Sequence, residues 1–420
     1  MTKNLTTYFA IMLLACFNLG AQTNVKVMFY NLLNYPLEDA VPNREPFLAT
    51  VLSDYQPDLF LVCELNNETG ANNVLNIVQN AVSADYTMAT YVSNTSDDLT
   101  GNQNDLQNLL YYDSTKFILL EEIIVPTDLR DFNVYKLRLN TVDQNTNPIE
   151  LYVVVCHLKA SSGPDNAQQR FEMVQELDSY LNTLPASSNV LLGGDLNIYT
   201  ANESAFQELL DVTNNITFTD PPNRIGSWNN NVNFVDVFTQ STRTQSGLGG
   251  STGGFDDRFD FILTSENMLS SANLTYVADS YKAYGNNGVS SCYNRAINSS
   301  DCAGPEFSFA IRDALHNFSD HLPVTLSLQT SALLNTPEFD QSNYIKIKNN
   351  ITSYYLDIYN NSFELINEVF VVFNQLGQRV KMFKISEGLN SIDVSHFKNG
   401  LYYIVTKDIK FKPKKFIVYH

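Results

Sequence analysis

The chain has 420 residues, of which 44% are hydrophobic, 12% aromatic and 17% charged. This composition can bury a substantial core, so it excludes intrinsic disorder and collagen-like repeats, and the length fits about two domains. With 26 Lys and Arg against 45 Asp and Glu, the formal net charge is −19. Such a balance excludes a broad basic surface that would bind nucleic acid by counterion release, so any phosphate must be held locally.

The charge is unevenly distributed along the chain. The last 80 residues contain 11 Lys and Arg against 6 Asp and Glu, a net charge of +5. The first 340 contain 15 against 39, a net charge of −24. The sequence therefore predicts two bodies of opposite sign.

Residues 1–21 are typical of a secretory signal peptide, with Lys3, an apolar run from Tyr8 to Phe17, and Ala21 at the end. The run is shorter than the ~20 residues that span a bilayer, and a buried N-terminal helix is the alternative. The segment ending at Cys16 loosely resembles a lipoprotein signal, although Leu14 is large for its position. No later apolar run approaches spanning length, so no stable membrane insertion is expected.

The remaining four cysteines fall into two kinds. Cys63 and Cys156 end apolar, strand-like runs, where cysteine usually acts as a small hydrophobe. Cys292 and Cys302 lie ten positions apart in a polar loop. In an exported protein this spacing favours a disulfide, and a metal-binding pair is the alternative.

Residues 22–330 alternate strand-like and helix-like stretches, which predicts an α/β domain. The two clearest helices are expected at Arg44–Tyr55 and Ala167–Leu184. The Gly-rich segment 247–254 lacks the features of a phosphate-binding loop and is predicted to be a flexible surface loop. The expected strands are Val25–Tyr30, Asp58–Cys63, Leu109–Tyr112, Val134–Leu139, Glu150–Cys156, Val190–Leu192, Phe259–Leu263 and Pro323–Leu328.

Breakers at residues 331–343 indicate a linker. Beyond it, residues 344–420 contain short alternating runs separated by Asn-Asn, Leu-Gly-Gln and Asn-Gly. This pattern predicts a small all-β sandwich.

Polar side chains follow the apolar strands of the first domain, where the ends of strands bring distant residues to one place. Taken singly, each has a bland explanation, such as a solvated strand end or, for Asp195 and Asn197, an Asx-type turn. Converging buried carboxylates without partners are costly, so a cation or mutual hydrogen bonds are expected. The residues concerned are Asn31, Glu64, His157, Asp195, Asn197, Asp260, Asp320 and His321.

Their order, with Gly194-Asp195-Leu196-Asn197 and Ser319-Asp320-His321-Leu322-Pro323, resembles the endonuclease/exonuclease/phosphatase superfamily (DNase I-like) from Asn31 to Val324. The resemblance implies a four-layer sandwich of two packed β-sheets flanked by helices. It also implies hydrolysis of phosphate esters that depends on Mg²⁺ or Mn²⁺, and it leaves room for a structural Ca²⁺ ion.

Carried over by position, the resemblance makes Glu64 the main metal ligand, assisted by Asn31 and Asp320. Asp195 would orient or deprotonate the attacking water, and Asn197 would hold a phosphate oxygen. His321, oriented by Asp260, and His157 would act on the phosphoryl group. No cysteine or Gly-x-Ser-x-Gly elbow is placed as a nucleophile, so direct attack by water is expected.

Three further residues are candidates for substrate binding. Arg130 resembles the family's phosphate-contacting arginine, with a surface arginine as the alternative. Asn108 lies where relatives carry an active-site Tyr or Asn, next to tyrosines that fit a strand core. Lys159 follows His157 by two positions, and a solvated lysine is its alternative reading.

The last ~75 residues resemble the C-terminal sorting domain of the type IX secretion system of Bacteroidetes. The resemblance is carried by the segment Phe373–Val380, by Asn399-Gly400-Leu401-Tyr402-Tyr403 and by the basic end at Lys414 and Lys415. An adhesive or carbohydrate-binding β-sandwich is the alternative. With the signal peptide, the sorting domain predicts a protein that is secreted or displayed on the surface of a Gram-negative bacterium and that engages this secretion machinery.

The expected function is that of a secreted, metal-dependent phosphodiesterase, acting as an endonuclease on extracellular nucleic acid and working as a monomer. Rival hypotheses are a sphingomyelinase-like lipid phosphodiesterase, a phosphomonoesterase, and a non-enzymatic cell-surface binding module. The lipid hypothesis calls for an exposed aromatic hairpin, and the single tryptophan, Trp228, in a polar Asn-rich loop gives it thin support.

Overall fold

The computed structural model describes residues 23–96, 106–270, 273–335, 345–361, 365–406 and 413–420. The chain divides into two compact units, with the boundary after Leu334. The predicted signal peptide, including Cys16, and residues 336–343 of the predicted linker lie outside the described residues. Among the described helices, none is long and apolar enough to cross a membrane.

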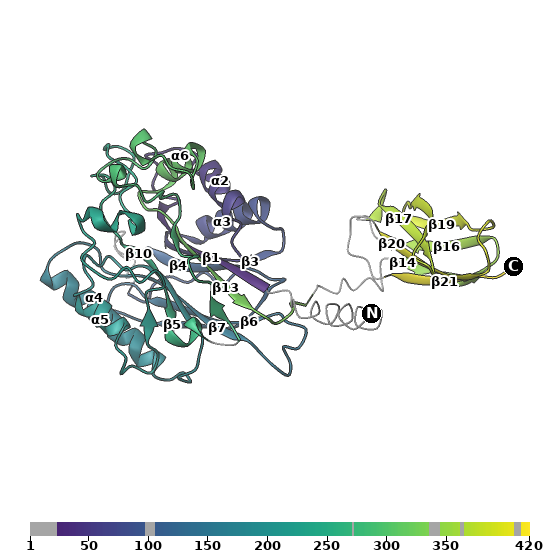
Figure 1. Cartoon of the computed structure of the whole chain (residues 1–420), viewed down its shortest axis with the longest axis horizontal. Helices are drawn as coiled ribbons and strands as arrows, with labels where there is room; N and C mark the ends of the chain where they lie inside the picture. Colours follow the sequence, from purple (N-terminus) through teal and green to yellow (C-terminus); the bar gives the residue numbers. More distant parts are fainter. Residues whose placement is uncertain (1–22, 97–105, 271–272, 336–344, 362–364, 407–412) are drawn as a thin grey trace, which may run out of the picture. The chain divides into compact units, whose positions relative to one another are not determined.

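The first unit is built on two β-sheets (Figure 1). In the first sheet, β1 and β2 are parallel neighbours and form its centre. Its strands, in spatial order, are β11 (Thr275–Tyr276), β13 (Val324–Thr330), β1 (Thr23–Tyr35), β2 (Leu59–Leu65), β4 (Gln107–Asp113) and β3 (Tyr86–Met88), with β12 (Lys282–Ala283) also paired to β13.

The second sheet repeats this plan, since β7 and β8 are parallel neighbours at its centre. Its order is β5 (Phe117–Val125), β6 (Phe132–Leu139), β7 (Glu150–His157), β8 (Val190–Asp195), β10 (Asp260–Ser265) and β9 (Phe218–Thr219). All eight expected strands are present, whereas β5 and the short strands β3, β9, β11 and β12 were not expected.

The two sheets pack face to face, with β1 and β2 against β7 and β8. Phe29, Leu61, Val154 and Leu192 are fully buried members of this core. Strands buried on both faces read as continuous apolar runs rather than as an alternating pattern, which explains why they stand out in the sequence.

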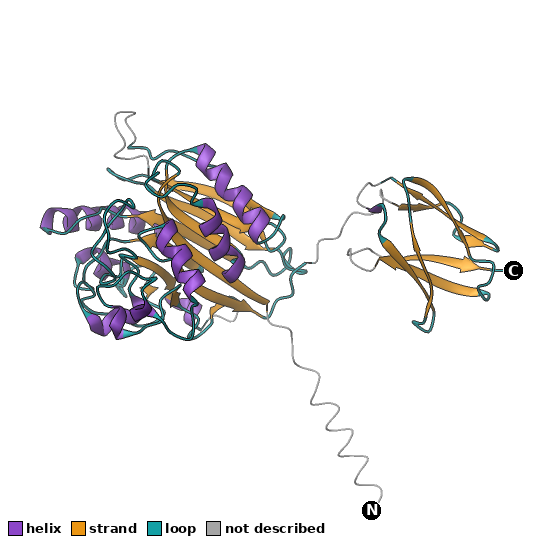
Figure 2. Ribbon diagram, turned by 90° about the horizontal axis from the view of Figure 1, so that it is seen from above, coloured by secondary structure: helices purple, strands orange, loops and turns teal. Residues whose placement is uncertain are grey.

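Helices cover the outer faces (Figures 1 and 2). On the first sheet lie α2 (Glu45–Tyr55), α3 (Glu68–Ala81) and α6 (Phe309–Phe318), and on the second α4 (Pro164–Leu181) and α5 (Ser204–Leu209). Short 3₁₀ helices occur at η1 (Val232–Val237), η2 (Glu266–Leu269), η3 (Ser290–Cys292) and η4 (Ser300–Cys302). The predicted four-layer sandwich is confirmed.

Two sequence-based expectations about local environment can be compared with this unit. Cys63 and Cys156 are buried free thiols, as expected, and a disulfide joins Cys292 to Cys302. Trp228, however, is fully buried, and its indole nitrogen donates to the Arg224 carbonyl at 2.7 Å. Trp228 is therefore a core residue and not part of an exposed hairpin.

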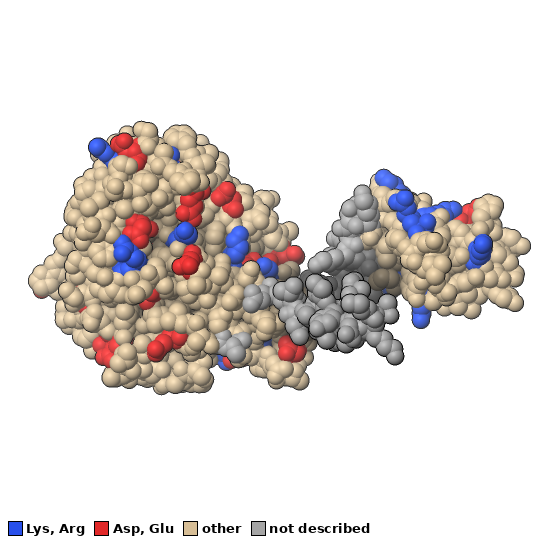
Figure 3. Space-filling view, in the orientation of Figure 1, with Lys and Arg blue, Asp and Glu red and all other residues tan. Residues whose placement is uncertain are grey.

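The second unit is an all-β sandwich with its own apolar core, which includes Leu356, Phe370 and Phe416. One sheet has the order β14 (Ile345–Ile347), β16 (Tyr355–Asn360), β19 (Gly388–Asp393). The other has the order β15 (Ile351–Thr352), β21 (Lys414–Val418), β20 (Gly400–Thr406), β17 (Val369–Asn374), β18 (Arg379–Lys384). Lys and Arg gather on the face of this unit seen in Figure 3, in keeping with its basic sequence.

Candidate active site

Three neighbouring strands of the second sheet place polar residues side by side at one edge. His157 is the register partner of Asp195 between β7 and β8. Asp195 is also the partner of Asp260 between β8 and β10. The three residues are nearly or completely buried, so their position at the strand ends brings ionisable groups into the interior.

The two glycines before Asp195 allow β8 to fit between its neighbours. A Cβ at Gly193 would lie 2.7 Å from Leu61 Cδ2 in the opposite sheet. A Cβ at Gly194 would lie 2.3 Å from Cys156 Sγ on the adjacent strand. Both glycines lie within β8, so they serve close packing, and only the residues that follow them form a turn.

In that turn, the Asn197 backbone nitrogen donates to Asp195 Oδ1 at 3.1 Å, which is the Asx-type interaction considered from the sequence. Asn197 adopts a left-handed conformation with φ 51°. Its side-chain nitrogen lies 3.3 Å from the Leu158 carbonyl. The turn therefore fixes Asp195 and Asn197 together.

The first sheet contributes Asn31 and Glu64 through an irregularity in the pairing of β1 with β2 beyond Asn31. Glu64 has φ 58°, a left-handed conformation that costs a non-glycine residue about 1–2 kcal/mol. Glu64 Oε2 accepts from the Asn34 backbone nitrogen at 2.9 Å. The Glu64 side chain retains 16% exposure, so it is accessible from solvent.

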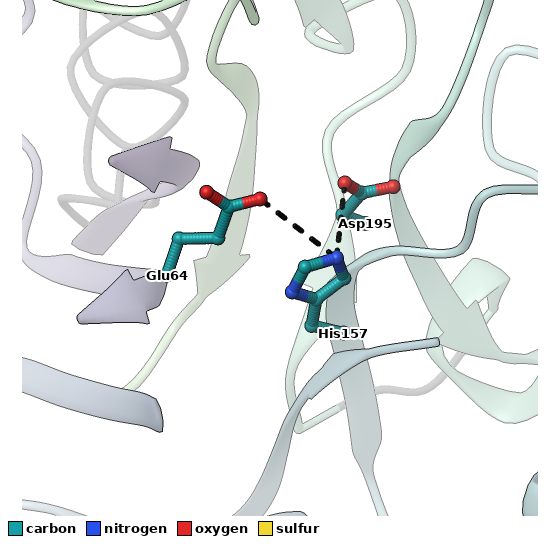
Figure 4. Close-up of side chains that lie close together, drawn as sticks. All are labelled: Glu64, His157 and Asp195. Carbon is teal, nitrogen blue, oxygen red and sulfur yellow. Dashed lines mark ion pairs between the residues drawn. The ribbon is translucent and has the colours of Figure 1, made fainter. Parts of the chain in front are cut away.

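Side chains from both sheets approach the Oδ2 atom of Asp195. Asn31 Nδ2 lies 3.0 Å from it and 2.9 Å from Glu64 Oε1, so the Asn31 amide bridges the two carboxylates. His157 Nε2 lies 3.6 Å from Asp195 Oδ2 and 3.9 Å from Glu64 Oε1 (Figure 4).

His321 reaches Asp195 from the loop before β13. Its Nε2 lies 3.7 Å from Asp195 Oδ2, and its Nδ1 lies 2.7 Å from Asp260 Oδ2. The Ser319 hydroxyl donates to the Asn31 carbonyl at 2.9 Å and accepts from the backbone nitrogen of His321 at 3.1 Å. Ser319 thus ties this loop to β1. We call Glu64, His157, Asp195, Asp260 and His321 the carboxylate–imidazole cluster.

Asp320 occupies a different environment from the cluster. Its Oδ2 accepts from the Ser251 backbone nitrogen at 2.7 Å and from Gln240 Nε2 at 3.3 Å. Its buried Oδ1 has no hydrogen-bond partner among the described residues. Asp320 is absent from the described residue groups whose ligand atoms all lie within 4.8 Å of one another.

The Gly-rich segment 247–254 is part of this environment, and most of its residues are exposed, as the prediction of a surface loop requires. A Cβ at Gly250 would lie 2.5 Å from Asp320 Cγ. Gly250 also has φ 64°. Glycine is therefore required so that the loop can close against the aspartate.

Asn31 differs from the metal-ligand role expected for it. Its Oδ1 accepts from the Leu33 backbone nitrogen at 2.9 Å, and its Nδ2 faces Glu64 and Asp195. In this orientation Asn31 positions the two carboxylates, and its side-chain oxygen is turned away from them.

The three substrate-binding candidates each donate hydrogen bonds to backbone carbonyls. The buried Arg130 donates from Nε to the His157 carbonyl and from Nη2 to the Leu158 carbonyl, at 2.9 and 2.6 Å. Arg130 is therefore not a surface residue, and these two donors hold the strand end. The buried Asn108 donates to the Asp131 carbonyl at 2.9 Å, and Lys159 Nζ to the Ala160 carbonyl at 3.0 Å.

Sequence reasoning missed Gln240 and Ser251 and gave Ser319 no role, although it quoted Ser319 in a motif. Gln240 Nε2 lies 2.5 Å from His321 Nε2. Nothing in the surrounding sequence marks Gln240, because its position depends on a loop that folds back on itself. The role of Ser319 could have been predicted, since a serine hydroxyl often accepts a hydrogen bond from a backbone N–H two residues further along the chain.

No protein-family model matches the chain, and no curated protein matches it. Solved structures are similar to it. An endonuclease/exonuclease/phosphatase from Bacteroides vulgatus has a TM-score of 0.46 at 14% identity, over 73% of this chain and 98% of that chain. The human nocturnin catalytic domain has a TM-score of 0.44 at 15% identity, over 73% and 94%. Danio rerio TDP2 complexed with a single-strand DNA product has a TM-score of 0.44 at 16% identity, over 73% and 100%.

Burial raises the pKa of both central carboxyl groups. For Asp195, burial is the main cause, Asp260 and Glu64 add to it, and the pKa rises to about 8. For Glu64, burial and then the charge of Asp320 raise the pKa above its ordinary value. The positive charge near Glu64 and Asp195 is therefore too small to offset the effect of burial on their pKa values.

The two imidazoles have pKa values shifted in opposite directions. Burial, and then the charges of Arg130 and His321, lower the pKa of His157 well below its ordinary value. Burial also opposes the charge on His321, but Asp260, Asp320 and Asp195 outweigh it and hold its pKa well above the ordinary value. Two groups of one type are thus set to different protonation states by their surroundings.

These observations fit a divalent cation. The ligand atoms that lie within 4.8 Å of one another are the carboxylate oxygens of Glu64 and Asp195 with His157, and the carboxylates of Asp195 and Asp260 with His321. The hard carboxylate oxygens suit Mg²⁺ or Mn²⁺. Raised carboxyl pKa values and the unpartnered Asp320 Oδ1 indicate unmet demand for positive charge. Glu64 and Asp195 would hold the ion, whereas Asp320 belongs to neither group of close ligand atoms.

Mg²⁺ is expected to stabilise the protein more at pH 8 than at pH 5. The pKa of Asp195 in the folded protein is about 8, above its ordinary value of 3.8. The contribution of this group to the free energy of unfolding is therefore fully present below pH 3.8 and is lost as the pH rises toward about 8. A bound cation requires the ionised carboxylate and removes this penalty at high pH. At one hundred times Kd, binding stabilises by about 2.7 kcal/mol.

Thermal unfolding with Mg²⁺ or EDTA at both pH values measures this effect. Asp195→Asn should abolish the difference between the two pH values. Equal stabilisation at both pH values in the unaltered protein would contradict the expectation.

Proposed function

We propose that the first unit is a phosphodiesterase of the endonuclease/exonuclease/phosphatase superfamily that depends on Mg²⁺ or Mn²⁺ and cleaves nucleic acid by direct attack of water. The observation that carries the proposal is the convergence on Asp195 Oδ2 of Asn31 at 3.0 Å, His157 at 3.6 Å and His321 at 3.7 Å. These groups come from both sheets and from the loop before β13. Hydrolysis of an anionic ester needs a base for water and donors for the phosphoryl oxygens, and this cluster offers both.

Each residue has a role that follows from its contacts. Asp195 accepts a proton from water as the water oxygen bonds to phosphorus, and the bond from phosphorus to the leaving oxygen breaks. His321, held by Asp260, and His157 donate toward the phosphoryl oxygens. A cation at Glu64 and Asp195 would supply charge neutralisation and polarise the phosphate.

The position of Trp228 removes one argument for the lipid phosphodiesterase alternative. A lipid phosphodiesterase that works at a membrane surface calls for exposed aromatic groups. Trp228 is fully buried against Phe206 and Phe261. This chain thus offers no tryptophan for that task.

The test is to incubate the purified full chain with plasmid DNA, RNA, sphingomyelin and p-nitrophenyl phosphate, each with Mg²⁺ and with EDTA. Cleavage of plasmid DNA or RNA only with the metal is the expected result. Cleavage of sphingomyelin or the monoester alone would leave a phosphoesterase with a different substrate, and no cleavage of any substrate would favour the binding-module hypothesis.

We also propose that residues 1–21 and 344–420 direct export, the latter as a type IX sorting domain. The support is the resemblance of the two segments and the separate, basic β-sandwich that the second unit forms. In a host with this secretion system, removal of residues 344–420 should retain the protein inside the outer membrane. Unchanged appearance in the medium or at the cell surface would contradict the sorting role and favour an adhesive module.

A further inference from the structure

The segment 240–257, which we call the 240–257 loop, is folded back on itself and fixed in place. Its two arms pair through Ser241 N to Gly254 O at 2.9 Å and Asp257 N to Gln240 O at 2.9 Å. Arg243, fully buried, donates to the His316 carbonyl at 2.8 Å and to the Leu248 carbonyl at 2.7 Å. Arg243 therefore fastens the Gly-rich tip of the loop to α6.

This loop presents two groups to the Asp320-His321 pair. The Ser251 backbone nitrogen donates to Asp320 Oδ2 at 2.7 Å, and Gln240 Nε2 reaches the same oxygen at 3.3 Å. Gln240 Nε2 also lies 2.5 Å from His321 Nε2. Gln240 is thus the described side chain that contacts both members of the pair.

The geometry of His321 shows what this contact can do. Asp260, as a carboxylate, can only accept, so His321 Nδ1 carries the proton that it shares with Asp260 at 2.7 Å. The other nitrogen, Nε2, faces Gln240 at 2.5 Å and Asp195 Oδ2 at 3.7 Å. The orientation of the ring is therefore set at both nitrogens, by Asp260 on one side and Gln240 on the other.

We propose that Gln240 is a positioning residue, which holds the His321 ring and the Asp320 carboxylate so that His321 Nε2 is directed to the phosphoryl group. This inference rests on the proposed function. A primary amide suits the place because it can present either N–H or C=O to Nε2. A carboxylate there would stand beside Asp320 Oδ2, and an apolar group would leave Nε2 without this partner.

The experiment compares Gln240→Met and Gln240→Glu in the full chain with Gln245→Met, a matched change in the same loop at an exposed position. Three quantities are measured: kcat and KM for plasmid or RNA cleavage, the ¹⁵N shifts of the His321 ring at one pH, and the thermal unfolding temperature. The chain has five histidines, so the His321 signals can be assigned by their loss in His321→Ala.

We expect Gln240→Met to lower kcat about 10- to 100-fold, because a misdirected group costs rate even when substrate binding persists. KM should change by less than about threefold. The Nε2 shift should move in Gln240→Met and remain unchanged in Gln245→Met. Gln240→Glu should lower kcat at least as much, since the length of the side chain is kept but the N–H that faces Asp320 Oδ2 is replaced by a second carboxylate.

Two results would overturn the inference. If the unaltered chain cleaves its substrate and Gln240→Met retains its kcat, Gln240 does not position the reaction. If the His321 shift is unchanged in a folded Gln240→Met protein, the contact itself is absent. If the unaltered chain cleaves no phosphate ester, the proposed function is wrong, and the reaction role of Gln240 is wrong with it, whatever the shift shows.

Discussion

Asp195→Asn is expected to lower kcat about 10²- to 10⁴-fold, the range typical of a lost general base. Asp195 Oδ2 lies within 3.7 Å of both imidazoles and 3.0 Å from Asn31, so the amide would keep the shape of the site. The amide of the substituted residue 195 would nevertheless be unable to accept a proton from water. Single-turnover cleavage of DNA or RNA at saturating Mg²⁺ isolates this chemical step.

Glu176→Gln is the matched control for this change, because Glu176 is an exposed carboxylate on α4 and the same carboxylate-to-amide exchange should leave kcat unaltered. A second check uses His321→Ala. If Asp195 and His321 act as one unit, the double variant should be little slower than the slower single variant. An Asp195→Asn enzyme within threefold of the original kcat would rule out the proposed base.

Asp220→Ala is expected to lower the free energy of unfolding of the first unit by about 3–5 kcal/mol, the cost of leaving a buried charge without its partner. Arg258 Nη2 lies 2.6 Å from Asp220 Oδ1, and the side chains are 0% and 1% exposed. The guanidinium also lies 4.2 Å from the centroid of the Phe261 ring, so it has no access to water. Denaturant unfolding measured with EDTA present gives the value for the apo protein.

Glu306→Ala supplies the control, since the exposed Lys282–Glu306 pair should contribute about 1 kcal/mol or less. The double variant Arg258→Met/Asp220→Leu should recover much of the loss, because well-packed apolar side chains often replace a buried ion pair without cost. If Asp220→Ala costs no more than Glu306→Ala, Arg258 does not depend on this partner. Arg258 lies two residues before Asp260, so a large effect would also connect the core to the site.

Much of the site could be predicted because its residues are adjacent to features visible in the sequence. His157, Asp195 and Asp260 come at the ends of strands whose continuous apolar character is visible in one dimension. Gly193 and Gly194 directly precede Asp195, and only the structure shows that they serve close packing. Local pattern was sufficient here because strand direction and register deliver the ends of neighbouring strands to one edge.

Other parts of the site depended on contacts between distant segments. The Gly-rich segment is an exposed loop, as its composition predicts, and only the structure shows that Arg243 and Asp320 hold it against α6 and the loop before β13. The same is true of Arg130, whose surface alternative was wrong because the side chain is buried and binds two backbone carbonyls. Composition reports the average environment of a residue type, and here single long-range hydrogen bonds override that average.

The sequence by itself therefore determined the layered α/β unit, the separate β-sandwich and the residue types gathered at the strand ends. Apolar periodicity and turn-forming residues act over a few positions, and both are readable along the chain. Only the tertiary structure decided that the Asn31 amide bridges Glu64 and Asp195, and that Gln240 lies against His321. Hydrogen bonds of this kind act over about 3 Å in space between residues that are 33 to 164 positions apart in the chain, and no local pattern encodes them.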